Sequence, residues 1–309
     1  MIVCSALMIP PSRHSAKLRG IMVRNKTQQL PPPELVELRP GQSIELLKAL
    51  HILTRDGRLN QDSRRKLKQV YHLVQFVEPL LAQTVAEYSS VRMADIGAGK
   101  SYLGFILYDL FFKTRDDASH VYGIEARAGL VQQSVALAQQ LDFTRMTFLD
   151  LPVTAAMASP LLPAALDIVT ALHACDTATD DAIHLALRKQ ARYIVLAPCC
   201  QAEVATVLRK HKGAALGDPL MSVLTEAWRH PLHTREFGSH ITNVLRCLQL
   251  EAHGYQVNVT ELVGWEHSLK NELIIASYKD LPRARPTKRL HELLEKLGLT
   301  ELHERFATA

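Results

Sequence analysis

The chain has 309 residues, of which 47% are hydrophobic and 22% are charged, and its formal net charge is +5. This length and composition predict a globular protein with one large α/β domain and an extension. No apolar run approaches the ~20 residues that span a bilayer, so we expect no membrane association. The five cysteines, an odd number, favour free thiols over a disulfide framework. Together with a weak amino-terminal apolar run, they favour a cytoplasmic protein.

The first part of the chain is basic and rich in proline. Residues 1–42 contain a run of three prolines among scattered arginines and lysines and show no sustained apolar period. We therefore expect a poorly ordered arm here. Residues 43–90 are expected to form a helical extension ahead of the main domain.

One long helix is predicted within this extension. Apolar residues recur at steps of three and four and so share one stripe of a helix: Leu67, Val70, Val74, Val77 and Leu81. Either Asp62 or Ser63 is suited to cap its start. Cations cluster in its first turns, at Arg64, Arg65, Lys66 and Lys68. Because cations are mildly unfavourable at this end of a helix, two interpretations stay open: a solvated face, or a surface that contacts phosphates of a substrate.

Residues 91–280 alternate short β-rich runs with helical stretches. The runs are VRMADI, HVYGIE, RMTFLD, LDIVTALHA, ARYIVLAP, YQVNVTELVG and NELIIASYK. This alternation predicts an α/β, Rossmann-like fold with a mostly parallel sheet. Too few residues separate the last two runs for a crossover helix, so they must pair antiparallel. A seven-stranded sheet with a reversed last strand is typical of class I methyltransferases. Residues 281–309 are expected to form a basic linker and a short amphipathic helix.

The run MADIGAGKSYLGF contains a glycine-rich turn. Residues 99–101 match the end of a phosphate-binding P-loop, but Ala94 stands where that loop has its first glycine, and residues 91–96 are predicted to form a strand. The remaining turn, 97–100, is too short to surround a triphosphate. A dinucleotide site needs a third glycine where this chain has Tyr102.

Acidic residues at the predicted strand ends point to a different ligand. Asp95 ends the first strand just before Gly97 and Gly99, and a carboxylate there suits the cationic methionine part of S-adenosylmethionine. Glycines let the backbone approach the ligand closely. Glu125 ends the next strand, where an acid accepts hydrogen bonds from both ribose hydroxyls. The sequence therefore predicts an S-adenosylmethionine site.

Residues that follow the fourth and fifth strands should face the transferable methyl group, because ligands lie over the carboxyl ends of such strands. The candidates are His173, Cys175, Asp176, Cys199 and Cys200. The favoured interpretation is that His173 or Asp176 acts as a base. A cysteine nucleophile, as in cytosine-5 RNA methyltransferases, a zinc site, and a structural role for the cysteines stay open as alternatives. We predict no metal.

The turn between the last two strands should lie at the same edge. Trp265, Lys270 and Asn271 are placed there, where Trp265 could stack on a base and the other two could position a polar acceptor. An ordinary solvated hairpin turn is an equal alternative.

Several motifs together resemble a known group of proteins. RRKLKQVYHLVQF, ADIGAGKSYLGFILY, LHACDTATDDAI, APCCQ and EHSLKNELIIA are similar, in this order, to a class I methyltransferase domain family. This family includes bacterial methyltransferases of unassigned substrate. More distantly, the chain resembles the tRNA acceptor-stem 2'-O-methyltransferases and eukaryotic methyltransferase-like proteins.

The resemblance implies both a cofactor site and a reaction centre. It implies that S-adenosylmethionine is bound by Asp95, Gly97, Gly99, Lys100, Tyr102, Leu103, Glu125, Asp150 and His173, with Asp150 near the adenine. Residues 173–176 and 198–201 would surround the reaction centre. The tRNA enzymes carry zinc-binding clusters ahead of this domain, whereas residues 1–90 contain a single cysteine, Cys4.

We expect a methyltransferase acting on RNA, either tRNA or rRNA, with Arg64, Arg65 and Lys68 helping to hold the substrate. DNA is not expected as a partner. The alternatives are a small-molecule or protein methyltransferase and a non-catalytic binding module with this fold.

Overall fold

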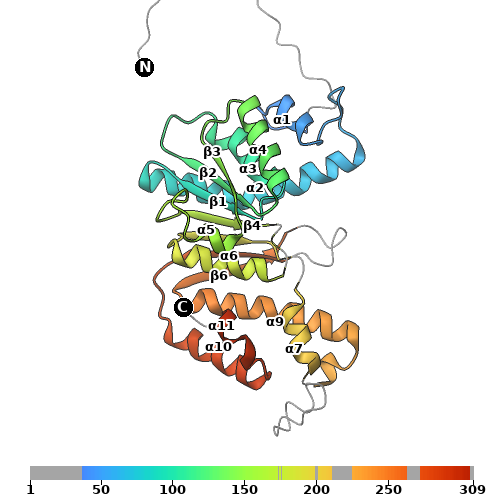
Figure 1. Cartoon of the computed structure of the whole chain (residues 1–309), viewed down its shortest axis with the longest axis vertical. Coiled ribbons are helices and arrows are strands. Elements are labelled where there is room, and N and C mark those ends of the chain that lie inside the picture. The colour runs from blue at the N-terminus through green and yellow to red at the C-terminus, as the bar shows by residue number, and fades with distance from the viewer. Residues whose placement is uncertain are drawn as a thin grey trace, which may run out of the picture.

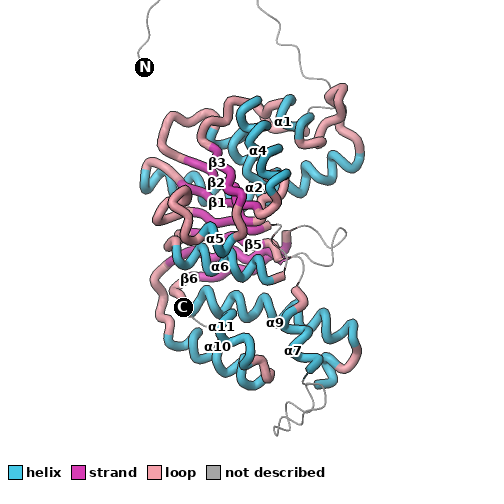
Figure 2. The backbone as a smooth tube through the Cα atoms, viewed as in Figure 1, coloured by secondary structure: helices cyan, strands magenta, loops and turns pink. Residues whose placement is uncertain are grey.

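A seven-stranded sheet forms the centre of the protein (Figures 1 and 2). The structure is a computed structural model that describes residues 37–172, 174, 176–198, 201–210, 225–262 and 272–306. The strands are β1 (Arg92–Ile96), β2 (His120–Glu125), β3 (Met146–Asp150), β4 (Ile168–Ala171), β5 (Tyr193–Leu196), β6 (Tyr255–Glu261) and β7 (Glu272–Tyr278). Their order across the sheet is β3-β2-β1-β4-β5-β7-β6.

The direction of β7 distinguishes this sheet from a fully parallel one. β1 to β5 pair in parallel, whereas β7 is antiparallel to both β5 and β6. Residues 262–271 alone connect β6 to β7, which allows a hairpin and no crossover helix. The predicted mostly parallel sheet with a reversed last strand is confirmed, and the reversed strand lies inside the sheet rather than at its edge.

Helices cover both faces of the sheet, as Figure 2 shows. One face carries α3 (Tyr102–Leu107), which continues as a π-helical turn over Tyr108–Phe112, and α4 (Ala128–Gln140). The other carries α5 (Val153–Ala156) and α6 (Thr177–Arg188). Successive strand residues point to opposite faces, so in β1 Met93 joins the core on the α3 side and Ala94 the core on the α6 side.

The amino-terminal extension consists of α1 (Ile44–Ala49) and α2 (Gln61–Tyr88). The predicted apolar stripe of α2 faces the core: Leu67, Val74, Val77 and Leu81 are buried, and Val70 is partly buried. The predicted cap was wrong. Asn60 caps α2 by accepting a hydrogen bond from the Ser63 amide at 2.8 Å, because the helix begins before Asp62.

The predicted arm largely lies outside the described residues, which start at residue 37. Its last part, which we expected to be poorly ordered, contacts α2: the guanidinium of Arg39 donates to Glu78 at 2.7 Å. No helix in the described part of the chain is long and apolar enough to cross a membrane.

A separate apolar core lies beside β6, at the lower end of the molecule in Figure 1. It joins α7 (Glu203–Lys210), α9 (Pro231–Ala252), α10 (Ala284–Lys296) and α11 (His303–Phe306), with short 3-10 turns at Thr225–Trp228 and Thr300–Leu302. α10 begins at Ala284, so most of the predicted basic linker is helical. The reason is tertiary, because Leu290 and Leu294 are fully buried in this core.

Candidate functional site

The glycine turn follows directly from β1. Gly97 (φ +64°) and Gly99 (φ +58°) both have left-handed backbone conformations, which residues other than glycine rarely adopt. A Cβ on Gly97 would lie 3.4 Å from the backbone of Ala174, in the segment after β4. The turn leads into α3 at Tyr102. The turn therefore presents a short stretch of backbone without side chains at Gly97 and Gly99, at the carboxyl edge of the sheet.

Asp95 lies on β1 just before this turn and is almost fully buried. Thr170 on β4, its neighbour in the sheet register, donates its hydroxyl to Asp95 Oδ1 at 2.7 Å. Burial raises the pKa of the Asp95 carboxyl to about 6, and the Thr170 hydrogen bond offsets part of this effect. A desolvated carboxylate of this kind is stabilised by a nearby cation.

Glu125 ends β2 and connects to the same turn. Its Oε2 accepts a hydrogen bond from the Gly99 amide at 2.8 Å. Arg127 donates to both carboxylate oxygens, through Nε at 2.8 Å and Nη2 at 3.0 Å. These hydrogen bonds from Arg127 and from the Gly99 amide lower the pKa of the Glu125 carboxyl, so it is ionised at neutral pH. Asp150, at the end of β3, is the register partner of Glu125 and is exposed.

The other predicted cofactor residues differ in how they present their side chains. Lys100 is exposed in the turn, and Tyr102 is partly buried at the start of α3. Leu103 is buried in the core on the α3 side, and its predicted contact with the cofactor stays a prediction. The residues that remain place carboxylates at three successive strand ends around a bare turn, which fits a ligand with a cationic end and a ribose.

The predicted reaction centre is described in part. His173, Cys175, Cys199 and Cys200 lie outside the described residues, as do Trp265, Lys270 and Asn271. Asp176 is described, and its Oδ1 accepts a hydrogen bond from the Ala202 amide at 2.9 Å. This contact joins the segment after β4 to the segment after β5. The two segments lie at the same edge because β4 and β5 are parallel neighbours.

The basic cluster in the first turns of α2 lies at the end of the helix that is nearer to the carboxyl edge of the sheet. α2 ends at Tyr88 shortly before β1 begins, so it runs opposite to β1 and its amino-terminal end points toward the carboxyl edge (Figure 1). With 28 residues α2 is about 42 Å long, whereas the five residues of β1 span about 17 Å. The first turns of α2 therefore extend beyond the sheet on the side where the glycine turn lies.

The cations of this cluster have different partners. Arg64 pairs with Glu37 at 2.9 Å, and Arg65 lies 3.5 Å from Asp62. Lys66 and Lys68 are exposed. The cluster is thus a solvent-facing basic surface rather than part of the core.

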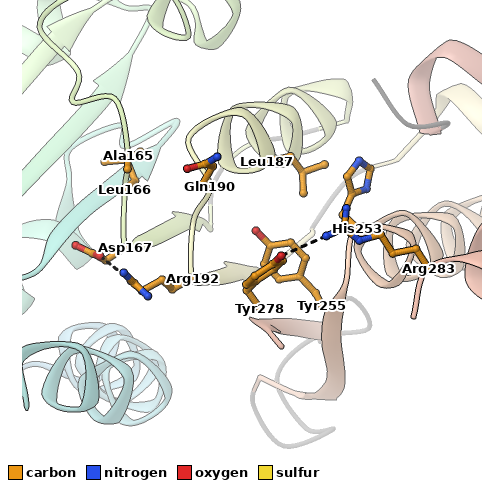
Figure 3. Close-up of a pocket in the computed structure, with 10 residues that line it drawn as sticks. All are labelled: Ala165, Leu166, Asp167, Leu187, Gln190, Arg192, His253, Tyr255, Tyr278 and Arg283. Carbon is orange, nitrogen blue, oxygen red and sulfur yellow. Dashed lines mark hydrogen bonds and ion pairs between the residues drawn. The ribbon is translucent and has the colours of Figure 1, made fainter. Parts of the chain in front are cut away.

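A cavity of about 500 Å³ lies at the opposite edge of the sheet (Figure 3). It is lined by residues that precede β4 and β5 or end β7, among them Asp167, Arg192 and Tyr278. Its guanidinium groups have protein partners: Arg192 donates to Asp167 at 3.1 Å, and Arg283 to Asp280 at 3.1 Å. In sheets of this type ligands lie over the carboxyl ends of the strands, so this cavity is not the cofactor site.

Sequence reasoning missed one group of residues at the carboxyl edge. Asn243 and Arg246 on α9 are buried and hydrogen-bonded to the segments that follow β4 and β5. The available signal was an arginine flanked by apolar residues in the run VLRCL of α9, since a fully buried arginine needs buried partners.

Comparisons with known proteins agree with this geometry. Residues 65–207 match the model of a family described as "Methyltransferase domain". No curated protein matches the chain. The chain therefore carries a methyltransferase domain over residues 65–207, and its sheet has the strand arrangement of the class I methyltransferase fold.

Several solved structures are similar to the chain at low identity. A putative O-methyltransferase from Klebsiella pneumoniae is 16% identical, with 79% of this chain and 94% of that chain covered and a TM-score of 0.47. Magnesium protoporphyrin IX methyltransferase from Synechocystis, solved with bound S-adenosylmethionine, is 14% identical, with 78% and 100% covered and a TM-score of 0.42. Human methyltransferase 10 domain containing protein is 14% identical, with 68% and 82% covered and a TM-score of 0.39. Likeness at this level carries no information about the substrate.

Proposed function

We propose that the protein methylates RNA at the carboxyl edge of its sheet. The observation that carries this proposal is the basic end of α2, which extends past the sheet on the side of the glycine turn. Clustered cations on one surface attract the phosphates of a nucleic acid. We further propose that Arg64, Arg65 and Lys68 contact the substrate, and that the protein acts in the cytoplasm on tRNA or rRNA.

The residues described at this edge support a particular way of holding the cofactor. Asp95 would face its cationic methionine part, Glu125 would accept the ribose hydroxyls, and the bare backbone of Gly97 and Gly99 would allow close approach. When bound, S-adenosylmethionine supplies an electrophilic methyl group. Lys100, Tyr102 and Asp150 are proposed as further contacts.

The acceptor needs a base, for which His173 and Asp176 are the proposed candidates. The hydrogen bond from the Ala202 amide fixes the orientation of the Asp176 carboxylate. A fixed orientation supports a role as a base, because a base must point at the proton that it accepts. Cys175, Cys199 and Cys200 are the candidates for a thiol mechanism, and Trp265, Lys270 and Asn271 are proposed to contact the acceptor.

The substrate class can be tested by reversing charge at Lys66 and Lys68, which are exposed and do not share the ion pairs of Arg64 and Arg65. We expect Lys66→Glu with Lys68→Glu to weaken RNA binding and to reduce the salt slope of log K by at least ~0.7, because Lys68 is a proposed phosphate contact and each lost contact on a single strand contributes ~0.7. The matched control reverses Lys288 and Lys296, which are also exposed but lie on α10.

Methyl transfer itself is measured by mass spectrometry of total RNA from cells with and without the protein. A modified nucleoside that disappears with the protein supports the proposal. Unchanged RNA, or equal RNA binding by the two charge-reversed proteins, would overturn it and favour a small-molecule or protein acceptor.

A further inference from the structure

A buried ion pair joins α9 to the start of α6. Arg246 on α9 is fully buried and donates two hydrogen bonds to Asp180 in the first turn of α6, from Nε to Oδ1 at 2.7 Å and from Nη2 to Oδ2 at 2.9 Å. Nη2 also donates to the backbone carbonyl of Asp176 at 2.9 Å. One guanidinium thus fixes both the segment after β4 and the helix that follows it.

Asn243, one helical turn earlier on α9, extends this network to two more elements. Its Oδ1 accepts from Gln201 Nε2 at 2.9 Å and from Arg246 Nη1 at 3.2 Å. Its Nδ2 donates to Glu272 Oε2 at 2.7 Å, at the first residue of β7. The side chain therefore links the segment after β5 to the start of β7, which lies at the same edge because β7 runs in reverse.

The backbone of Asp176 is held in a strained conformation at this point. Its φ of 51° and ψ of −125° lie in a region that residues other than glycine rarely occupy. Such a conformation costs ~1–3 kcal/mol and persists only where surrounding contacts hold it. Here the contacts are Arg246 on the carbonyl and the Ala202 amide on the carboxylate.

Stability alone does not account for a network of this kind. Buried ion pairs can often be replaced by apolar residues without loss of stability, because desolvation offsets most of the attraction between the charges. A hydrogen-bonded guanidinium also fixes the orientation of the groups that it binds, since its donors lie in one rigid plane. This network orients the ends of three strand connections that meet where the reaction centre is proposed.

We propose that Arg246 and Asn243 are positioning residues that hold the ends of β4 and β5 and the start of β7 in the arrangement needed for methyl transfer. This inference rests on the proposed function of the same edge. Neither residue is hydrogen-bonded to Asp95 or Glu125, which lie on β1 and β2. Cofactor binding and positioning of the acceptor are therefore separable by mutation.

The test compares Arg246→Lys and Asn243→Ala with Leu248→Ala. Leu248 is buried on the same helix but faces the apolar core with α7 and α10, so it controls for general destabilisation of α9. For the two network variants we expect transfer of tritiated methyl groups to RNA from cells lacking the protein to fall about 10–100-fold, as for other residues that orient a site indirectly. The Kd for S-adenosylmethionine should change by less than about threefold, which is small beside the expected 10–100-fold fall in methyl transfer.

Two further readouts separate positioning from folding. Hydrogen–deuterium exchange over residues 176–180, which Arg246 holds, should increase in Arg246→Lys and Asn243→Ala. It should stay unchanged in Leu248→Ala, because Leu248 packs against α7 and α10 and not against α6. Glu272→Gln, which keeps an oxygen for Asn243, should retain methyl transfer that Glu272→Ala loses.

Equal exchange and equal transfer in the network variants and the control would overturn the inference. So would a loss of cofactor binding as large as the loss of transfer. If the wild-type protein transfers no methyl group to RNA, the proposed function fails, whereas the exchange comparison still decides whether Arg246 and Asn243 position these segments.

Discussion

Replacing Asp95 with asparagine should stabilise the protein while it abolishes cofactor binding. The pKa of Asp95 rises from 3.8 to about 6 because the folded chain buries the carboxylate. At ~1.4 kcal/mol per unit of pKa, the charged form destabilises the fold by about 3 kcal/mol above pH 6. Asparagine has the same shape, keeps an oxygen for the Thr170 hydroxyl and carries no charge. We therefore expect Asp95→Asn to raise the free energy of unfolding at pH 7 by up to about 3 kcal/mol.

The sign of the pH dependence provides an independent check. Between pH 3.8 and about 6 the folded protein binds more protons at Asp95 than the unfolded chain, so this group makes the free energy of unfolding fall as pH rises through that window. Lowered pKa values, as at Glu125, act in the opposite direction, so the difference between wild type and Asp95→Asn isolates Asp95. Urea unfolding at pH 4 and pH 7 should show a stability gain for the variant that is larger at pH 7.

Cofactor binding completes this test. S-adenosylmethionine should bind the wild-type protein with constant affinity above about pH 6 and more weakly below, because its cationic end requires the ionised carboxylate. Isothermal calorimetry should detect no binding to Asp95→Asn. Asp150→Asn, at an exposed strand end, is the control and should change stability by less than about 0.5 kcal/mol. A variant less stable than wild type at pH 7, or one that binds the cofactor normally, would refute the reasoning.

Two further substitutions examine other parts of the structure. Arg127→Ala removes an exposed partner of Glu125, so we expect a stability change within ~1 kcal/mol and, because the carboxylate oxygens become free for ribose hydroxyls, up to about fivefold tighter S-adenosylmethionine binding by calorimetry. Weaker binding would show instead that Arg127 contacts the ligand. Gly238→Ala places a Cβ 2.7 Å from the backbone of Ala205, so α7 and α9 must separate. We expect a loss of ~1–3 kcal/mol in urea unfolding, and wild-type stability would contradict this close packing.

The features that the sequence predicted well depend on local patterns. Alternating apolar residues define each strand, and the short connection between the last two strands requires a hairpin, so the order of elements and the reversed strand follow from spacing alone. The glycine turn and the acids at the strand ends were also predictable. Their positions are fixed by where each strand stops, and Asp95 and Glu125 do lie beside the turn.

Other features depend on contacts between distant parts of the chain. Arg246 and Asp180 are 66 residues apart, so no local pattern marks them as partners. The start of α10 depends on an apolar core shared with α7 and α9, and the side chain of Leu103 is buried because α3 packs against the extension. The sequence by itself determined the sheet, the glycine turn and the carboxylates at the strand ends, because strand periodicity and turn chemistry are local. Only the tertiary structure decided which buried side chains link the segments at this edge of the sheet, because burial and hydrogen-bond partners are set by packing.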